Sequence, residues 1–304
     1  MANPTLHITI FVPDITFHIH HNMAFFNSKS YLSLSSSLLK IFISLLLLQL
    51  FNTSVNSQTP SPPDYETINF SFSSFDPNGP NLAVFQDASI CSAGILGLTK
   101  TDEQGKALQN SVGRLVYETP VHIWDISTGE IADFTAGFSF RVIPNGSEAR
   151  GDGFAFFLGP LLGKIPPKST GGYLGLFNPE TALDPNKNQI LAIELDTFPN
   201  DWDPSTPHIG INVGSIKSVA TVEWPAYSIP STALGYVSIN YVSESKRLGV
   251  LLSYPEISNA TTSLFATVDL TSVLPKYVRV GFSAATGDVV ETHDIYSFHF
   301  EAAL

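Results

Sequence analysis

Apolar and polar residues alternate in short runs from Thr67 to the C-terminus, and this period of two constrains the fold more than any other feature. Successive side chains of a strand point to opposite faces, so each run predicts a strand with one buried face. The alternating runs are 68–72, 138–142, 209–213, 237–241, 248–252, 278–282 and 295–300. Half-buried strands at this spacing predict stacked antiparallel sheets, and therefore an all-β sandwich without long amphipathic helices.

The composition agrees with one large β domain and excludes some partners. Of 304 residues only 14% are charged, while Gly and Pro number 21 each and Phe 22. Long helices prefer Ala, Glu, Lys and Leu, so this mix favours strands joined by turns. A formal net charge of −12 argues against nucleic acid and anionic membrane surfaces as partners. The single cysteine, Cys91, excludes an intrachain disulfide, and we expect it to be a small buried side chain.

The N-terminal region has the pattern of a secretory signal peptide. The apolar run Ile41–Leu50 follows Lys29 and Lys40, and Val55 and Ser57 occupy plausible −3 and −1 positions of a cleavage site. The run is shorter than the roughly 20 residues that span a bilayer, so we expect no membrane anchor.

This pattern divides the chain into two regions and predicts that the protein is secreted. We expect residues 1–57 to be an N-terminal extension and signal peptide, cleaved near Ser57, and residues 58–304 to form the folded domain. A start at Met23 would give a signal of ordinary length, so the choice between Met1 and Met23 stays open. The mature protein is then expected outside the cell or in the vacuole.

Glycosylation becomes possible in a secreted chain. Asn-x-Ser/Thr sequons after the signal are candidate sites for N-linked glycans. They lie at Asn69, Asn145 and Asn259.

Potential metal ligands are concentrated in one stretch, from Glu194 to His208. Glu194 and Asp196 end a run that alternates as a strand does, so both carboxylates are expected on one face. The Pro-, Asn- and Asp-rich residues that follow predict a loop, which can return further ligands to the same point. The five candidate side chains are Glu194, Asp196, Asn200, Asp203 and His208.

The types of ligand indicate which ions they suit. Oxygen ligands without a thiolate suit calcium, and an imidazole among carboxylates suits manganese or another transition ion. Because the stretch holds both kinds, it suggests two neighbouring ions that share Asp196 and Asp203. The alternative is a surface strand followed by an acidic loop, since Asp and Asn are also common in turns.

Two glycine-rich segments are candidates for ligand contact. Asp152 lies between Gly151 and Gly153, either as a turn aspartate or as a carboxylate that accepts ligand hydroxyls at a sheet end. The paired Gly171 and Gly172 allow a close backbone approach to a ligand, or form only a loop.

No catalytic constellation is complete in the sequence. Glu194-Leu-Asp196 begins the carboxylate pattern of jelly-roll glycosidases, but Pro199 stands where the second carboxylate is needed. Gly281-Phe-Ser-Ala-Ala lacks the second glycine of a nucleophile elbow. We therefore expect a protein that is not an enzyme.

Ordered motifs cover nearly all of the chain after residue 57. They are Phe75-Asp-Pro-Asn, Asn110-Ser-Val-Gly-Arg, Pro120-Val-His-Ile-Trp, Gly151-Asp-Gly-Phe-Ala-Phe-Phe, Gly172-Tyr-Leu-Gly-Leu-Phe, Glu194-Leu-Asp-Thr-Phe, Trp202-Asp-Pro, His208-Ile-Gly-Ile-Asn-Val-Gly and Val278-Arg-Val-Gly-Phe-Ser-Ala. Together they resemble the legume lectins. The resemblance implies an antiparallel jelly-roll β-sandwich, with a flat back sheet and a curved front sheet.

The same resemblance implies two metal sites. The transition-metal site, usually manganese, would use Glu194, Asp196, Asp203 and His208, with Ser218 near through water. The calcium site would use Asp196, the backbone carbonyl of Phe198, Asn200 and Asp203.

It also implies a shallow sugar pocket built from four loops, with a cis peptide between Gly151 and Asp152. Sugar hydroxyls would meet Asp152, Asn200 and the Gly172 N–H group, and Phe198 would lie under the sugar face. In the last loop, Asp288 and Val289 would face the ligand.

The implied function is metal-dependent, reversible binding of glycans or glycoproteins without catalysis. The short last loop, 286–293, favours mannose or glucose. A homodimer or homotetramer is expected, because several weak sites together raise the avidity. The alternative is a lectin-like storage or defence protein, such as an inhibitor of digestive enzymes, that has lost sugar binding. A glycosidase on the same sandwich is the third possibility.

Overall fold

The computed structural model describes residues 9–12, 15–18, 67–144, 149–258 and 260–304. The chain divides into the units Met1–Pro63 and Asp64–Leu304. In the first unit, β1 (Thr9–Val12) pairs with β2 (Ile15–His18) in antiparallel fashion.

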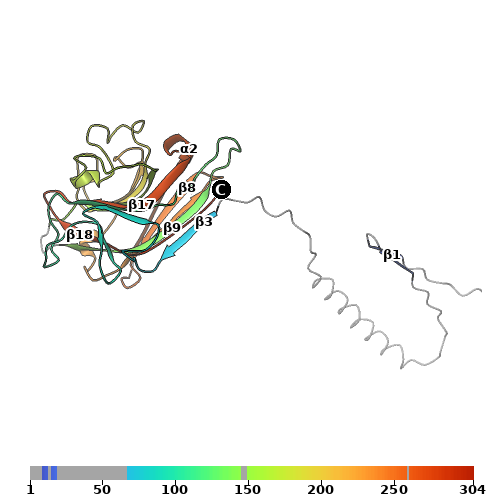
Figure 1. Ribbon diagram of the computed structural model, residues 1–304, viewed down its shortest axis with the longest axis horizontal. Coiled ribbons are helices and arrows are strands. Elements are labelled where there is room, and N and C mark those ends of the chain that lie inside the picture. Colours follow the sequence, from blue (N-terminus) through green and yellow to red (C-terminus); the bar gives the residue numbers. More distant parts are fainter. Residues whose placement is uncertain (1–8, 13–14, 19–66, 145–148, 259) are drawn as a thin grey trace, which may run out of the picture. The chain divides into compact units, whose positions relative to one another are not determined.

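The second unit is a sandwich of two antiparallel sheets of eight strands each (Figure 1). The front sheet has the order β13 (Ala220–Glu223), β12 (His208–Val213), β11 (Leu191–Asp196), β10 (Gly153–Pro160), β17 (Tyr277–Ala285), β7 (Val112–Tyr117) and β4 (Leu82–Gln86), with β8 (Val121–His122) also paired to β17. The back sheet has the order β16 (Thr261–Thr267), β15 (Arg247–Ser253), β14 (Gly235–Val242), β9 (Asp133–Pro144), β18 (Glu291–Ala303), β6 (Leu96–Gly97) and β5 (Ser89–Ile90), with β3 (Thr67–Phe72) also paired to β18.

Helices are short in the described part of the sandwich. They are the 3-10 turns η1 (Gly171–Tyr173) and η2 (Ala226–Ser228) and the α-helical turn α2 (Leu270–Val273). The prediction of an all-β sandwich is therefore confirmed.

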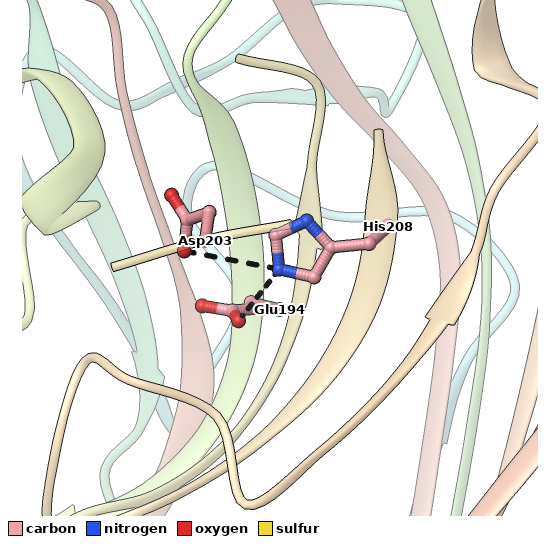
Figure 2. A group of neighbouring side chains, drawn as sticks. All are labelled: Glu194, Asp203 and His208. Carbon is pink, nitrogen blue, oxygen red and sulfur yellow. Dashed lines mark hydrogen bonds and ion pairs between the residues drawn. The ribbon is translucent and has the colours of Figure 1, made fainter. Parts of the chain in front are cut away.

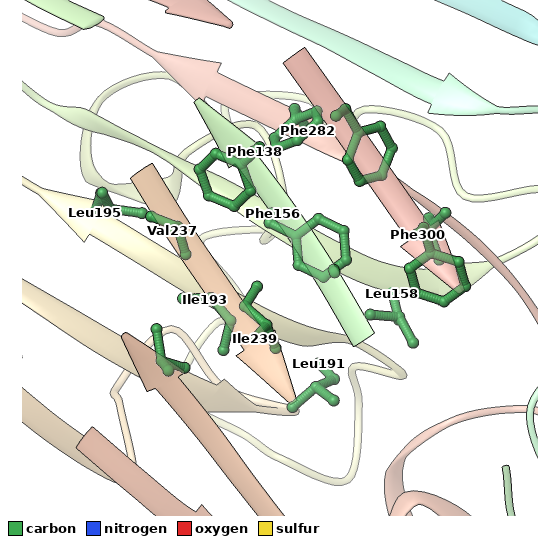
Figure 3. Packing of buried hydrophobic residues seen from close by; sticks show 14 of the residues in the cluster. Phe138, Phe156, Leu158, Leu191, Ile193, Leu195, Val237, Ile239, Phe282 and Phe300 are labelled. Carbon is green, nitrogen blue, oxygen red and sulfur yellow. The ribbon is translucent and has the colours of Figure 1, made fainter. Parts of the chain in front are cut away.

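Phenylalanine side chains fill much of the space between the sheets, as Figure 3 shows. The Phe282 ring, on the front sheet, meets back-sheet Phe138 and Phe298 at centroid distances of 5.0 and 4.8 Å in edge-to-face geometry. Such pairs stabilise a core by about 0.5–1.5 kcal/mol beyond the burial of area. The high phenylalanine content is thus explained in part by a core that is aromatic on both inner faces.

The predicted half-burial holds for one sheet more than for the other. Strand β14 alternates strictly between buried and exposed residues, as expected. Strand β12 and most of β17 are instead buried on both faces, so the prediction was wrong for them. Loop residues cover the outer face of the front sheet with a second apolar cluster, which includes Leu174, Phe177 and Ile216.

The prediction for Cys91 was also wrong, because its side chain is exposed. Cys91 follows the two-residue strand β5 and begins a tight turn. In that turn the Gly94 N–H donates to the Cys91 carbonyl at 2.9 Å, and the Cys91 N–H donates to the Ile95 carbonyl at 3.0 Å. Because this turn follows a strand at the edge of the sheet, the thiol lies outside the apolar core.

Some predictions fall on residues outside the described ranges. These are the apolar run 41–50, the cleavage site near Ser57, and the sequons at Asn145 and Asn259. Asn69 is described, and its exposed side chain lies on β3. Among the described residues, no helix is both long and apolar enough to cross a membrane.

Candidate functional site

Strand β11 places two carboxylates on the outer face of the front sheet. Ile193 and Leu195 belong to the core between the sheets, so the period of two turns Glu194 and Asp196 the other way. His208 begins the neighbouring strand β12 and lies directly opposite Asp196 in the ladder. The strand predicted for this segment, and the shared face of its two carboxylates, are confirmed.

The loop after β11 folds back, as its composition predicts. The Phe198 N–H donates to Asp196 Oδ1 at 2.8 Å, and the Asn200 N–H donates to Asp203 Oδ2 at 2.9 Å. A turn closes when the Asp203 N–H donates to the Asn200 carbonyl at 3.0 Å. These bonds return Asp203 to the end of the strand.

Glu194, Asp203 and His208 form a compact group of possible metal ligands (Figure 2). One ligand atom from each lies within 4.8 Å of the others. His208 Nε2 lies 3.1 Å from Glu194 Oε1 and 3.9 Å from Asp203 Oδ1. Asp196, predicted in the same site, is not one of these three, although the charges of Glu194 and Asp203 act on it.

Ser218 and Gly210 fix the position of Glu194. The Ser218 hydroxyl donates to Glu194 Oε1 at 2.5 Å, which is a direct contact. A Cβ atom on Gly210 would lie 2.0 Å from Ser218 Oγ and 2.2 Å from Glu194 Oε1. Only glycine therefore fits at this position of β12 beside the ligand group.

The electrostatics of the group favour a bound cation. Burial, together with the charges of Glu194 and Asp203, raises the pKa of Asp196 well above its usual value. Burial and the charge of Glu194 likewise raise the pKa of Asp203 to about 7. Burial opposes the charged form of His208, but its hydrogen bond to Glu194 and the nearby carboxylates raise its pKa overall.

Two buried oxygen atoms beside this group have no hydrogen-bond partner in the described part of the chain. They are Glu194 Oε2 and Asn200 Oδ1. Leaving such atoms buried and unpaired costs free energy, and buried carboxylates that repel one another cost more. Hard oxygen atoms and one imidazole are ligands that suit divalent ions, so the residues fit a metal site.

Asp152 immediately precedes β10, whose first residue, Gly153, pairs with Asp196 of β11. The Gly151–Asp152 peptide is cis, as the resemblance implies. The Thr197 N–H donates to the Asp152 carbonyl at 2.9 Å, which joins the aspartate to the loop of Phe198 and Asn200. The side chain is only 3% exposed, and its Oδ2 atom has no hydrogen-bond partner among the described residues.

The surroundings of Asp152 raise its pKa to about 7. Burial is the main cause, and the charge of Glu291 adds to it. The nearby backbone N–H group of Gly287 acts in the opposite direction. A ligand hydroxyl group that donates to this carboxylate would favour its charged form and so offset the effect of burial.

Four chain segments meet around Asp152. A Cβ atom on Gly287 would lie 2.9 Å from Asp152 Oδ2, and one on Gly172 would lie 2.0 Å from Asn200 Oδ1. A Cβ atom on Gly151 would lie 2.7 Å from Phe198 Cβ and 2.9 Å from Val289 Cγ2. The predicted pocket residues therefore come together, as expected from the resemblance. Asp288 differs from the other predicted pocket residues because it is exposed. Its backbone carbonyl accepts a hydrogen bond from Gln109 Nε2 at 2.5 Å.

Sequence reasoning missed several residues that support these loops. Buried Glu291, at the start of β18, accepts a hydrogen bond from the Thr197 hydroxyl. Arg114 donates to the carbonyls of Gly163 at 2.8 Å and Gly175 at 2.5 Å, and so anchors the segment that carries Gly172. Arg114 is the last residue of the motif Asn110-Ser-Val-Gly-Arg, so the sequence did contain a signal for it. Glu291 belongs to no such motif, and the pattern of β18 does not set it apart from its neighbours.

The sandwich and its loop cluster define a carbohydrate-binding protein of the lectin class. The legume lectin domain matches residues 67–303, and the chain belongs to this family. Members of the family are non-catalytic carbohydrate-binding proteins, so the chain binds carbohydrate and is not an enzyme.

Known relatives agree with this assignment. Lectin 9 of Medicago truncatula is 57% identical over 90% of this chain and 100% of its own length. The metal-free form of lectin I-B4 from Griffonia simplicifolia is 40% identical, with a TM-score of 0.73 over 78% of this chain and 100% of that chain. The acidic lectin of winged bean, solved with methyl-α-D-galactose, is 38% identical, with a TM-score of 0.68 over 78% and 99%.

Proposed function

We propose that this chain is a secreted, metal-dependent lectin whose sugar pocket is built around Asp152. The observation that carries the proposal is the buried Asp152 Oδ2 atom, which lacks a protein partner among the described residues and lies beside Gly287. A charged acceptor held in this way gains a strong hydrogen bond when a sugar hydroxyl arrives.

Each of the other pocket residues has a distinct role in the proposal. Asn200 and the Gly172 N–H group bind further hydroxyls, and their contact fixes the spacing between these two polar groups. The ring of Phe198 supports the apolar C–H face of the sugar, because aromatic faces pack well against such surfaces. Val289 closes the side of the pocket next to Gly151.

The proposed metals are a transition ion, manganese, and calcium. Glu194, Asp196, Asp203 and His208 would hold manganese, while Asp196, the Phe198 carbonyl, Asn200 and Asp203 would hold calcium. Both ions supply positive charge that offsets the clustered carboxylates. The unpaired Glu194 Oε2 and Asn200 Oδ1 atoms support this assignment. With Asn200 and Asp203 held by one ion, the loop presents Asn200 and Phe198 in fixed positions.

The sugar class is open to a direct test. The short last loop favours mannose or glucose. The relative from winged bean was solved with methyl-α-D-galactose, which favours a galactose-type sugar. These sugars differ in the direction of the 4-hydroxyl group, so the geometry of Asp152 and Asn200 towards that hydroxyl decides between them.

Secretion, glycosylation and assembly belong to the same proposal. The signal-peptide pattern before Ser57 supports export to the extracellular space or the vacuole. In a secreted chain, the exposed Asn69 is available to carry a glycan, and Asn145 and Asn259 are further candidates. A homodimer or homotetramer would compensate for weak single sites through avidity.

A glycan array probed with the mature protein tests the proposal. We expect binding with calcium and manganese present, loss of binding after chelation at low pH, and recovery when both ions return. Binding that survives complete metal removal would contradict metal dependence. Absence of binding to every glycan would instead favour the storage or defence alternative, in which sugar binding is lost.

A further inference from the structure

Tyr227 is an exposed aromatic residue whose ring is held rigidly. It lies in η2 and is 50% exposed. Its hydroxyl group donates to the Thr197 carbonyl at 2.6 Å. The guanidinium carbon of Arg150 lies 4.5 Å from the ring centroid. Because Arg150 occupies one face and Thr197 fixes the hydroxyl end, the accessible area lies on the side away from Arg150.

Both residues that hold this ring are chain neighbours of the sugar pocket. Thr197 immediately precedes Phe198, and its N–H group donates to the Asp152 carbonyl at 2.9 Å. Arg150 immediately precedes Gly151, which packs against the Cβ atom of Phe198. Arg150 is itself buried and donates to the Ala226 carbonyl at 3.2 Å, next to Tyr227. The ring is therefore tied to two of the loops that form the pocket.

We propose that Tyr227 forms a second sugar subsite, which binds the next pyranose of an oligosaccharide whose first sugar lies at Asp152. This inference rests on the proposed function of the Asp152 pocket. A pyranose presents an apolar C–H face, and an aromatic ring offers a flat surface to match it. Since Thr197 and Arg150 already restrict the ring, binding costs little side-chain entropy.

The position of the ring distinguishes it from other exposed aromatic residues. Tyr277 is 39% exposed and also has a cation near its face, Lys276 Nζ at 5.5 Å from the centroid. It starts β17, however, and Ala285 at the other end of this strand pairs with Gly153 beside the pocket. The two ends are eight residue steps apart, which is roughly 26 Å along a strand. Tyr277 is therefore a matched control that lies too far away to contact the same short oligosaccharide.

Calorimetry on the metal-loaded protein tests the proposal with two pairs of probes. They are mannose with mannotriose, and galactose with N-acetyllactosamine. For the pair that binds, we expect the oligosaccharide to bind about 5- to 10-fold more tightly than the monosaccharide. Tyr227→Ala should remove this gain and leave monosaccharide affinity within about twofold, whereas Tyr277→Ala should retain the gain.

Two more variants separate stacking from support of the loop. Tyr227→Phe removes the hydrogen bond to Thr197 but retains the ring, so most of the gain should remain. Tyr227→Trp enlarges the ring and should retain or increase the gain, which keeps the test decisive if Tyr227→Ala fails to fold.

Several results would overturn the subsite. One is an oligosaccharide that binds no more tightly than its monosaccharide to the unchanged protein. Another is a set of Tyr227 variants that weaken both probes equally, since this would assign Tyr227 a purely structural role. If the unchanged protein binds none of the four sugars and no glycan of the array, the proposed pocket itself fails and the subsite fails with it.

Discussion

Gly172 and Asn200 lie in such close contact that a Cβ atom on Gly172 would fall 2.0 Å from Asn200 Oδ1. The two residues come from different loops, one in the 3-10 turn η1 and the other after β11. Glycine is required here because the side-chain amide occupies the place of any larger residue. The absence of a Cβ atom on Gly172 thus fixes the spacing of two polar groups that are assigned to the proposed pocket.

Gly172→Ala should therefore weaken sugar binding by at least about 10-fold, because the added methyl displaces Asn200 or the Gly172 backbone. Titration calorimetry with the best sugar from the array measures the effect. Gly249→Ala is the matched control, since a Cβ atom there would meet nothing closer than Asn240 O at 3.9 Å. Unchanged affinity in Gly172→Ala would show that these two residues do not shape the pocket.

Asp152→Asn should weaken sugar binding by about 10-fold or more while calcium still binds. The substitution keeps the shape of the side chain but removes the charge, and a hydrogen bond to a charged acceptor contributes about 1.5–3 kcal/mol. This corresponds to a loss of roughly 10- to 150-fold in affinity. Sugar titration and calcium titration of the same sample separate the two effects. Retained sugar binding would contradict the role assigned to Asp152.

Metal removal should lower the thermal stability of the sandwich. Ions at 100 times their dissociation constant stabilise a folded protein by about 2.7 kcal/mol, or roughly 5–10 °C for a domain of this size. Scanning calorimetry with calcium and manganese, and again after chelation, gives the difference. In Glu194→Gln, manganese should raise the melting temperature by less than in the unchanged protein, because one ligand charge is lost. If the melting temperature is the same with both ions and after chelation, the proposed metal sites are excluded.

The sequence predicted local features of the site better than contacts between distant segments. The period of two placed Glu194 and Asp196 on one face, and the residues after them predicted the returning loop. Tyr227 and Glu291 both contact Thr197, yet they lie 30 and 94 positions away from it in the chain. No local pattern encodes such contacts. The burial of both faces of β12 could not be predicted for the same reason, because residues from distant loops cover its outer face.

Arg114→Gln should destabilise the fold by about 2–4 kcal/mol. The buried guanidinium donates to the carbonyls of Gly163 and Gly175 and lies 4.9 Å from the centroid of the Phe157 ring. A shorter side chain leaves these carbonyls without their charged donor. Chemical denaturation measures the change. Arg247→Gln is the control, because Arg247 lies over the exposed Phe265 ring and its loss should cost less than about 1 kcal/mol.

Asp294→Asn should make the protein more stable at neutral pH. Burial raises the pKa of Asp294 above its usual value, although the charges of His293 and Arg141 oppose this shift. A folded-state pKa above the unfolded one means that the carboxyl stabilises the fold when protonated. This contribution is complete below the unfolded-state pKa and is lost as the pH rises through the folded-state pKa. The amide cannot ionise, so the variant avoids that loss.

Thermal melts between pH 4 and pH 8 test this expectation. The melting temperature of Asp294→Asn relative to the unchanged protein should increase with pH, since only the unchanged protein must bury the charged form. Glu103→Gln, an exposed change in a turn, controls for the loss of one negative charge. A difference that stays constant with pH would show that the Arg141 and His293 charges balance the burial of Asp294, and one that decreases as the pH rises would show that they outweigh it.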